Sequence, residues 1–221
     1  PTIQGLFIEI APDFSTSYAY LEAIGKALED FKQSKKPIAV YSETYSLPLL
    51  STFAGANIIS INPTGSASLQ GPSTSLLYYR ELLNKLSINP IVYQSAENKT
   101  FGERFTHTSP RPETKERLHK LLSQFYDYSI TTLSNQRKIS KETIGELNKT
   151  YAYLTPLQGK QVGIIDTIGH REDLLEQLTS LTTNNDQAPN KTKEGSPEKQ
   201  EDNNAPRKLS TVDLSTYNAK H

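Results

Sequence analysis

The stretch Pro37-Ile38-Ala39-Val40-Tyr41 sets a run of β-forming residues directly after a proline that can stop a helix. Upstream of it, apolar side chains recur at spacings of three and four and so share one helix face: Leu21, Ile24, Leu28 and Phe31. Ser15 or Ser17 can cap that helix, and a β-rich run precedes it at residues 5–10. A strand, a helix and a second strand in this order predict a parallel pair joined by a right-handed crossover, and therefore an α/β fold.

The same alternation continues toward the middle of the chain. Ser46 is suited to begin a helix, and residues 57–61 predict a third strand. The sequence Asn62-Pro63-Thr64-Gly65 predicts a turn that ends this strand. Beyond it, we expect a helix over residues 74–86 that buries its leucines, and a fourth, buried strand over residues 90–93.

The later part of the sequence predicts more helices and one more strand. Pro112 can open a helix that runs to about Arg137, the longest we expect. Ser140 and Thr155 are each suited to cap a short helix. The last expected elements are a strand over residues 162–166 and a closing helix over residues 171–178.

Composition changes near residue 180. Residues 182–206 are rich in Asn, Lys, Glu, Pro and Gln, so they cannot bury enough apolar surface to offset their chain entropy. We therefore expect a folded domain over residues 1–179 and a disordered polar linker over residues 180–208. Residues 209–221 then alternate like an edge strand and are expected to lead into a second half of the protein.

The totals exclude several classes of function. Lys plus Arg and Asp plus Glu both number 24, and a nucleic-acid surface needs a basic excess, so no nucleic-acid partner is expected. Cysteine is absent, the histidines lack metal spacing, and no phosphate-binding glycine motif occurs, so no metal or cofactor is expected. Methionine is absent even at position 1, so we expect the chain to be part of a longer product that once held more sequence upstream.

Residues 98–105, Asn-Lys-Thr-Phe-Gly-Glu-Arg-Phe, hold the lysine with the best case for chemistry. Lys99 follows the strand expected at residues 90–93, precedes the helix that opens at Pro112, and has aromatic neighbours. A fold can exclude water from such a junction, and desolvation disfavours an ammonium ion, which makes a lysine usable as a general base. A solvated lysine is the alternative, because most lysines are exposed.

Ser46 occupies the position between a strand and a helix where α/β hydrolytic folds carry a nucleophile. Its neighbours Leu47 and Pro48 are not the glycines that such a turn needs, so we interpret Ser46 as a helix cap. After the first strand, Ala11-Pro12-Asp13 stands where a glycine pair could supply an oxyanion hole. The chain therefore offers a candidate base and no convincing nucleophile.

Taken in order, several segments resemble signal peptide peptidase A (protease IV), in particular the amino-terminal half of its tandem-repeat form. The most specific are residues 77–86, Leu-Tyr-Tyr-Arg-Glu-Leu-Leu-Asn-Lys-Leu, and residues 98–105, at the separation found in the family. The likeness covers roughly positions 3–178. Shorter matches lie at residues 23–28, 36–40, 43–46, 57–59 and 62–65.

The resemblance implies a crotonase/ClpP-like fold of repeated β-β-α units and a serine endopeptidase (hydrolase) with a serine–lysine dyad. In the tandem family the first half supplies the lysine and the second half supplies the serine. Lys99 falls on the lysine position, and the serine equivalent of this half falls near Leu47. This fragment alone is then expected to be inactive.

The resemblance also implies partners and a location. The expected substrates are cleaved signal peptides or other apolar peptides. The expected partners are the second half of the same polypeptide and further copies of the chain, in a homo-oligomer. The assembly would be attached to the cell inner membrane with its catalytic domain on the extracytoplasmic side.

Two other readings stay open. A degenerate, non-catalytic crotonase-like scaffold for assembly or binding would share the fold without the chemistry. An acyl-CoA enzyme of the same fold class would need oxyanion-hole donors that the sequence does not supply.

Overall fold

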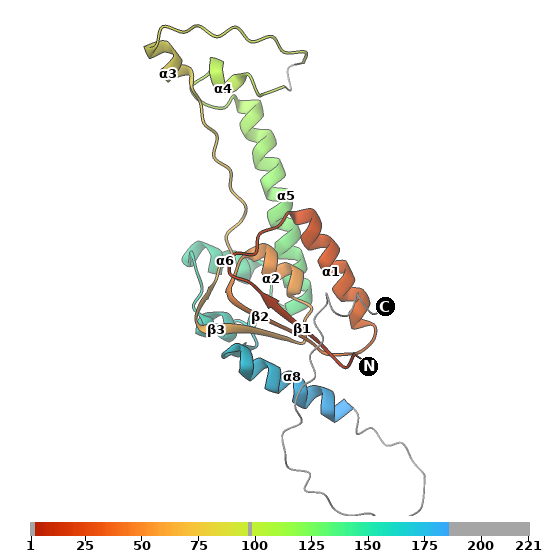
Figure 1. Cartoon of the computed structure of the whole chain (residues 1–221). Coiled ribbons are helices and arrows are strands. Elements are labelled where there is room, and N and C mark those ends of the chain that lie inside the picture. The colour runs from red at the N-terminus through yellow and green to blue at the C-terminus, as the bar shows by residue number, and fades with distance from the viewer. Residues whose placement is uncertain (1–2, 97–98, 186–221) are drawn as a thin grey trace, which may run out of the picture.

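The computed structural model describes residues 3–96 and 99–185, which form a body and a long projecting arm (Figure 1). The elements are β1 (Leu6–Ile10), α1 (Tyr18–Lys32), β2 (Ile38–Tyr45), α2 (Leu47–Phe53), β3 (Ile58–Ala67), α3 (Arg80–Lys85), α4 (Glu103–Thr106), α5 (Pro112–Arg137), α6 (Lys141–Thr150), α7 (Pro156–Gln161), β4 (Thr167–Ile168) and α8 (Arg171–Asn185).

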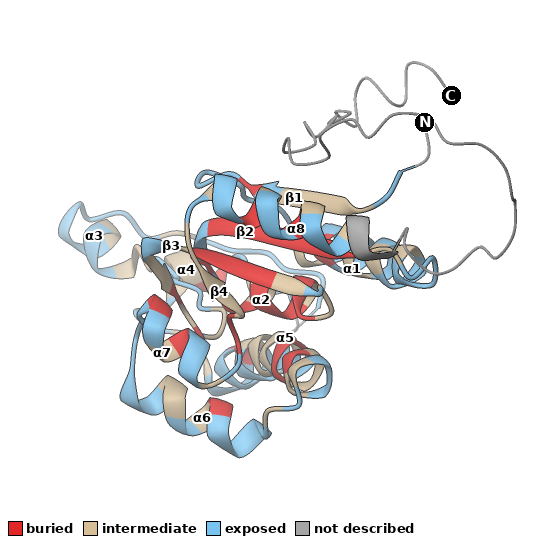
Figure 2. Cartoon of the chain, turned by 90° about the horizontal axis from the view of Figure 1, so that it is seen from below, coloured by how far each residue is buried: buried red, intermediate tan, exposed pale blue. Residues whose placement is uncertain are grey.

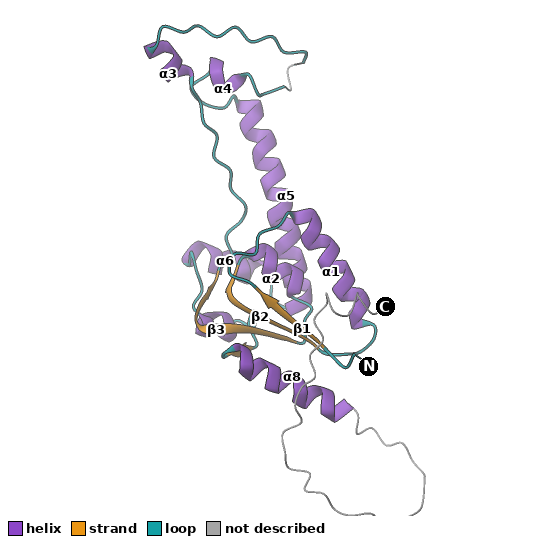
Figure 3. Ribbon diagram, viewed as in Figure 1, coloured by secondary structure: helices purple, strands orange, loops and turns teal. Residues whose placement is uncertain are grey.

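The described strands form one parallel sheet in the order β1-β2-β3-β4. Figure 3 shows β1, β2 and β3 side by side in this sheet. β1 pairs with β2 from Leu6 opposite Ile38 to Ile10 opposite Ser42, which confirms the predicted parallel pair and the α/β class. β2 and β3 pair in two segments separated by a register shift between Ser42 and Thr44. The extra residues lie in β3, and β2 runs unbroken from Ile38 to Tyr45, directly before α2.

The prediction that a turn at residues 62–65 ends the third strand was wrong. Strand β3 continues through these residues, and they form the register shift. Four residues of β3 lie opposite the single residue Glu43 of β2. A Cβ atom on Gly65 would lie 2.1 Å from the Glu43 carbonyl oxygen, so only glycine fits at this close approach of two backbones. The Asn62 side chain accepts hydrogen bonds from the N–H and hydroxyl groups of Thr64, which is local turn geometry held within a strand.

Helices cover both faces of the sheet: α1, α2 and α5 lie on one side and α8 lies on the other (Figure 1). Successive side chains of β2 point to opposite faces of the sheet, as in any β-strand, and so pack against different helices. Ile38 and Val40 pack with the α2 and α5 side, whereas Ala39 and Tyr41 pack with α8. Figure 2 shows the buried residues concentrated in β2 and β3 and in the helix faces against them.

Several helix ends match their predicted signals. Ser17, Ser140 and Thr155 each accept a hydrogen bond from a backbone N–H in the first turn of the helix they cap. α5 begins at Pro112 and ends at Arg137, as predicted. α8 continues through Asn185, past the boundary predicted at residue 179. The first six residues of the linker predicted over residues 180–208 thus belong to α8, and the rest of it, with the strand predicted in residues 209–221, lies outside the described residues.

The strand predicted over residues 162–166 was wrong, because pairing to the sheet starts only at Thr167. Ile164 and Ile165 are buried, so the apolar run belongs to the core rather than to a strand. At this edge the Asp166 carboxylate accepts the backbone N–H of Ile59 at 2.8 Å, so a side chain takes the place of a ladder hydrogen bond.

The arm consists of residues 73–96 and 99–118: an extended strap, α3, a loop, α4 and the first turns of α5 (Figure 1). The helix predicted over residues 74–86 was wrong, since only Arg80–Lys85 is helical and none of its residues is buried. The buried strand predicted over residues 90–93 was also wrong: Ile91 is 75% exposed and Tyr93 is 93% exposed. Both segments lie away from the sheet, so there is no core for their apolar side chains to enter.

Candidate functional site

Lys99 lies in the arm, in the short segment that leads into α4. Its backbone N–H donates to the carbonyl oxygen of Ala96 at 3.1 Å, and its side chain is exposed. The expected enclosure between a buried strand and a helix is absent, because residues 90–93 form no strand. Within the part of the chain that the structure describes, the lysine side chain is therefore exposed to solvent.

Four residues further on, Glu103 is a carboxylate only 3% exposed. It accepts hydrogen bonds from the Tyr78 hydroxyl at 3.3 Å, the Thr114 hydroxyl at 2.7 Å, and both the backbone N–H and the Nε of Arg111. These donors come from the strap, from the N-cap residue of α5 (Arg111) and from the first turn of α5. Glu103 therefore ties together three segments of the arm that are distant in sequence.

The charge on Glu103 is stabilised by these donors. Burial alone would raise the pKa of its carboxyl, but the backbone N–H of Arg111, the Thr114 hydroxyl and the Arg111 guanidinium outweigh burial and hold that pKa below its usual range. Burial, followed by the negative charge of Glu103, raises the pKa of the Tyr78 phenol. Both shifts keep an ionised carboxylate facing a protonated phenol, the pair that the hydrogen bond requires.

Arg104 fixes the other side of α4 to the strap. Its guanidinium donates to the Leu77 carbonyl oxygen at 3.1 Å and to the Tyr79 hydroxyl at 3.3 Å, and lies 5.4 Å from the centre of the Tyr79 ring. The Tyr79 N–H donates to the Arg104 carbonyl oxygen at 2.7 Å. The two residues therefore contact one another through both their backbones and their side chains.

Close packing holds the segment between the lysine and α4. A Cβ atom on Gly102 would lie 2.2 Å from Cγ1 of Val92, so the absence of a side chain lets the two segments touch. Phe105 stacks on Tyr79 and meets Phe101 edge to face. Phe101 is nevertheless mostly exposed, next to Lys99 in the sequence.

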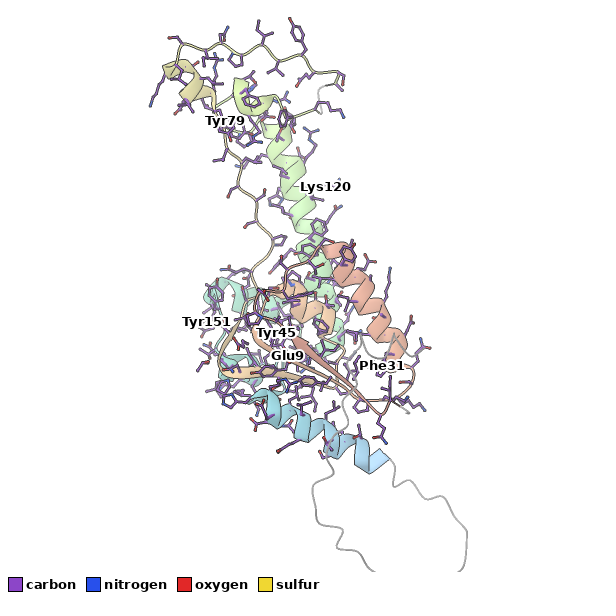
Figure 4. All side chains as sticks on the ribbon, in the orientation of Figure 1. Glu9, Phe31, Tyr45, Tyr79, Lys120 and Tyr151 are labelled. Atoms are coloured by element: carbon purple, nitrogen blue, oxygen red, sulfur yellow. The ribbon has the colours of Figure 1, made fainter. Side chains whose placement is uncertain are left out.

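Ser46 lies in the body, far from this part of the arm. Figure 4 labels Tyr79 at the outer end of the arm and Tyr45, the residue before Ser46, within the sheet. Ser46 is the N-cap residue of α2, as predicted, although its side chain makes no capping hydrogen bond. It lines a cavity of about 520 Å³ with other hydroxyl side chains, among them Thr44, Ser66 and Ser68.

The structure thus separates the candidate lysine from the serine that sequence reasoning weighed. In the described residues, no group of three or more His, Cys, Asp or Glu side chains could hold a metal ion. Sequence reasoning missed Glu103. Its available signal was a carboxylate one helical turn after the lysine, flanked by two aromatic residues, but an isolated glutamate usually lies on a solvated surface.

Comparison with known proteins identifies the chain as a relative of proteases. It is 28% identical to Protease 4 of Haemophilus influenzae over 188 residues, which are 82% of this chain and 31% of that protein. Protease 4 of Salmonella typhi is 28% identical over 64% of this chain and 23% of its own length. The chloroplastic serine protease SPPA of Arabidopsis thaliana is 23% identical over 80% of this chain and 26% of its own.

The chain belongs to peptidase family S49, whose sequence pattern matches residues 30–184. This confirms the resemblance to signal peptide peptidase A. The chain spans less than a third of the length of the Protease 4 relatives.

Two solved structures are similar over 79% of the chain. One is a membrane-bound stomatin-specific protease in complex with a substrate peptide, with 15% identity, a TM-score of 0.42 and 64% of its length covered. The other is an enoyl-CoA hydratase/isomerase from Marinobacter aquaeolei, with 9% identity, a TM-score of 0.40 and 50% of its length covered.

Proposed function

We propose that this chain is the amino-terminal half of a serine–lysine peptidase in which Lys99 is the general base. Membership of peptidase family S49 supports a protease, and the length of the Protease 4 relatives leaves room for a second half. One observation carries the finer proposal: the lysine segment is anchored at the outer end of the arm, away from Ser46 and the body. A base held in this way serves a nucleophile that comes from elsewhere.

The proposed chemistry follows from a neutral amine at Lys99. The amine takes the proton of a serine hydroxyl from the second half, and the serine oxygen attacks a peptide carbonyl carbon. The Lys99 ammonium gives this proton to the peptide nitrogen as the peptide bond breaks, and an acyl-enzyme and a neutral amine at Lys99 remain. Lys99 then takes a proton from water, the resulting hydroxide attacks the acyl carbonyl carbon, and Lys99 returns the proton to the serine oxygen as the acyl–serine bond breaks.

The surroundings of Lys99 support burial upon assembly. Ile91, Tyr93 and Phe101 are each more than 70% exposed in the same arm. Covering these side chains with a second half or a second copy would remove water from the arm and favour the uncharged amine. Their apolar character also fits the proposed substrates, cleaved signal peptides or other apolar peptides.

The proposed setting is a homo-oligomer attached to the cell inner membrane, with the catalytic domain on the extracytoplasmic side. No helix in residues 3–96 or 99–185 has the length and apolar character needed to cross a bilayer. The attachment proposed here would use sequence other than these residues.

One observation favours the second candidate, a non-catalytic scaffold for assembly or binding. The Lys99 side chain is exposed in the described chain, and a solvated ammonium ion is a poor base. A scaffold would use the same exposed apolar arm for association alone. The two candidates differ in whether any serine of the protein is activated.

A fluorophosphonate probe distinguishes them, because it reacts covalently with activated serines. The full-length polypeptide, including a second half, is treated with the probe, digested and sequenced by mass spectrometry. We expect the label on one serine outside residues 1–221, and no label on the chain of residues 1–221 alone. A label on Ser46 would contradict the proposal, and no label on any serine, together with no hydrolysis of apolar peptides, would favour the scaffold.

A further inference from the structure

We infer that Glu103 is a positioning residue for Lys99: its buried carboxylate fixes the lysine segment to the start of α5. The inference rests on the proposed role of Lys99 as base. It extends that role to a side chain that touches neither the substrate nor the reacting atoms.

Both oxygens of the Glu103 carboxylate are used. Oε1 accepts from the Tyr78 hydroxyl and the Arg111 backbone N–H, and Oε2 accepts from the Thr114 hydroxyl and Arg111 Nε. A glutamine at this position would keep one acceptor oxygen and turn an NH₂ group toward the donors at the other. The site is therefore specific for a carboxylate rather than for any polar side chain of this size.

The anchor lies close to the lysine along the chain. The Glu103 N–H donates to the Thr100 carbonyl oxygen at 3.1 Å, and the Lys99 N–H donates to that of Ala96 at the same distance. The hydrogen-bonded turn of residues 100–103 therefore joins the anchored residue to Thr100, the residue directly after the lysine. The contact of Gly102 with Val92 leaves little room for the intervening chain to shift.

Loss of the anchor would displace the base. In Glu103→Gln, the buried donors lose one of their acceptor oxygens. We therefore expect the first residue of α4 to move away from the start of α5. A base displaced by about 1 Å can lower the rate of proton transfer by about a hundredfold. Proton transfer takes place after the peptide is bound, so we expect kcat to fall while KM stays within about twofold.

The test uses the full-length polypeptide and four variants: Lys99→Ala, Glu103→Gln, Thr114→Val and Asp166→Asn. Asp166→Asn is the matched control, because Asp166 also accepts a backbone N–H and an arginine, but at the opposite end of α5. Peptide hydrolysis is measured per folded molecule, with the folded fraction taken from circular dichroism. We expect kcat to fall by about ten- to a hundredfold in Glu103→Gln and less in Thr114→Val, with Asp166→Asn close to wild type.

Each outcome decides between the two claims. If Lys99→Ala is inactive while Glu103→Gln and Thr114→Val keep the wild-type kcat, the positioning role is overturned and the base stands. If Asp166→Asn loses as much kcat as Glu103→Gln, the effect is general destabilisation and the positioning role is overturned. If Lys99→Ala keeps full activity, the proposed base fails and the positioning role fails with it. Should Glu103→Gln not fold, Thr114→Val alone decides.

Discussion

Glu103 makes the order of the arm depend on pH. Its hydrogen bonds lower the pKa of the carboxyl in the folded chain below the ordinary value of 4.5, although burial opposes them. A carboxyl with a lowered folded pKa contributes stability that is fully present above its unfolded pKa and is lost as the pH falls through the folded pKa. We therefore expect the contacts among the strap, α4 and α5 to loosen below about pH 4.5, seen as faster hydrogen exchange in residues 99–114.

A variant without the titrating group is the control for this prediction. Glu103→Gln should show faster exchange in the arm at neutral pH and no further step on acidification. An acid step of equal size in wild type and in Glu103→Gln would assign the loosening to another group.

Gly102 allows a second prediction at the scale of single residues. Gly102→Ala would place a methyl group against Val92, and the overpacking should cost about 1–3 kcal/mol of local stability. The backbone at Gly102 has a φ of −67°, which any residue adopts, so the cost is steric. Val92→Ala should remove most of it in the double variant, as measured by the rate of trypsin cleavage after Lys99 and Arg104. Equal cleavage of the single and double variants would contradict this account.

At the scale of elements, α5 is held at its ends by two carboxylates. At its last turn, Arg137 donates to the Asp166 carboxylate and to the Gly163 carbonyl oxygen, and its side chain is 10% exposed. Arg137→Ala would leave these acceptors without their partner, so we expect a loss of about 1–3 kcal/mol in the free energy of unfolding.

Arg171 provides the matched control, since it pairs with Glu9 where both side chains are more than 40% exposed. Exposed ion pairs contribute little, so Arg171→Ala should cost at most about 1 kcal/mol. Urea unfolding followed by circular dichroism measures both variants. If both variants lose the same free energy of unfolding, the contacts of Arg137 at the end of α5 do not stabilise the fold more than an exposed ion pair does.

The elements of the body could be predicted from sequence because their signals are local. Three local signals each act within a few residues: the run of β-forming residues at 38–41 after Pro37, the caps at Ser17 and Ser140, and Pro112 at the start of α5. The prediction of a turn at residues 62–65 was wrong, because these residues instead continue β3 and pair with β2. Gly65 makes this pairing possible, since it leaves room for the neighbouring backbone.

The arm could not be predicted because its apolar residues look like core residues. Leu77, Leu82 and Ile91 have the pattern of buried elements, yet they lie exposed on a projection without a layer to pack on. The candidate site shows the same limit: the resemblance placed Lys99, but the partners of Glu103 lie up to 25 residues away in sequence. Convergence of that kind is a property of the tertiary fold.

At the scale of the whole molecule, the arm extends well beyond the body (Figure 1). Several of its apolar side chains, among them Ile91 and Tyr93, are exposed. Contiguous exposed apolar surface promotes association. We expect Ile91→Glu and Tyr93→Glu to shift the full-length protein toward smaller species in sedimentation-velocity experiments. Tyr20→Glu is the control, because Tyr20 is an exposed aromatic residue of α1 in the body and should leave the distribution unchanged. Identical distributions for all three variants would contradict an assembly role for the arm.

The most direct test of the central claim is hydrolysis of an apolar peptide by the full-length polypeptide, comparing wild type, Lys99→Ala and Lys115→Ala. Lys115 is an exposed lysine in the first turns of α5, so it matches Lys99 in charge and in its place in the arm. If Lys99 is the general base, Lys99→Ala should lose at least about a hundredfold in kcat while remaining folded, and Lys115→Ala should stay at the wild-type value. Equal activity in all three proteins would show that Lys99 is not the base.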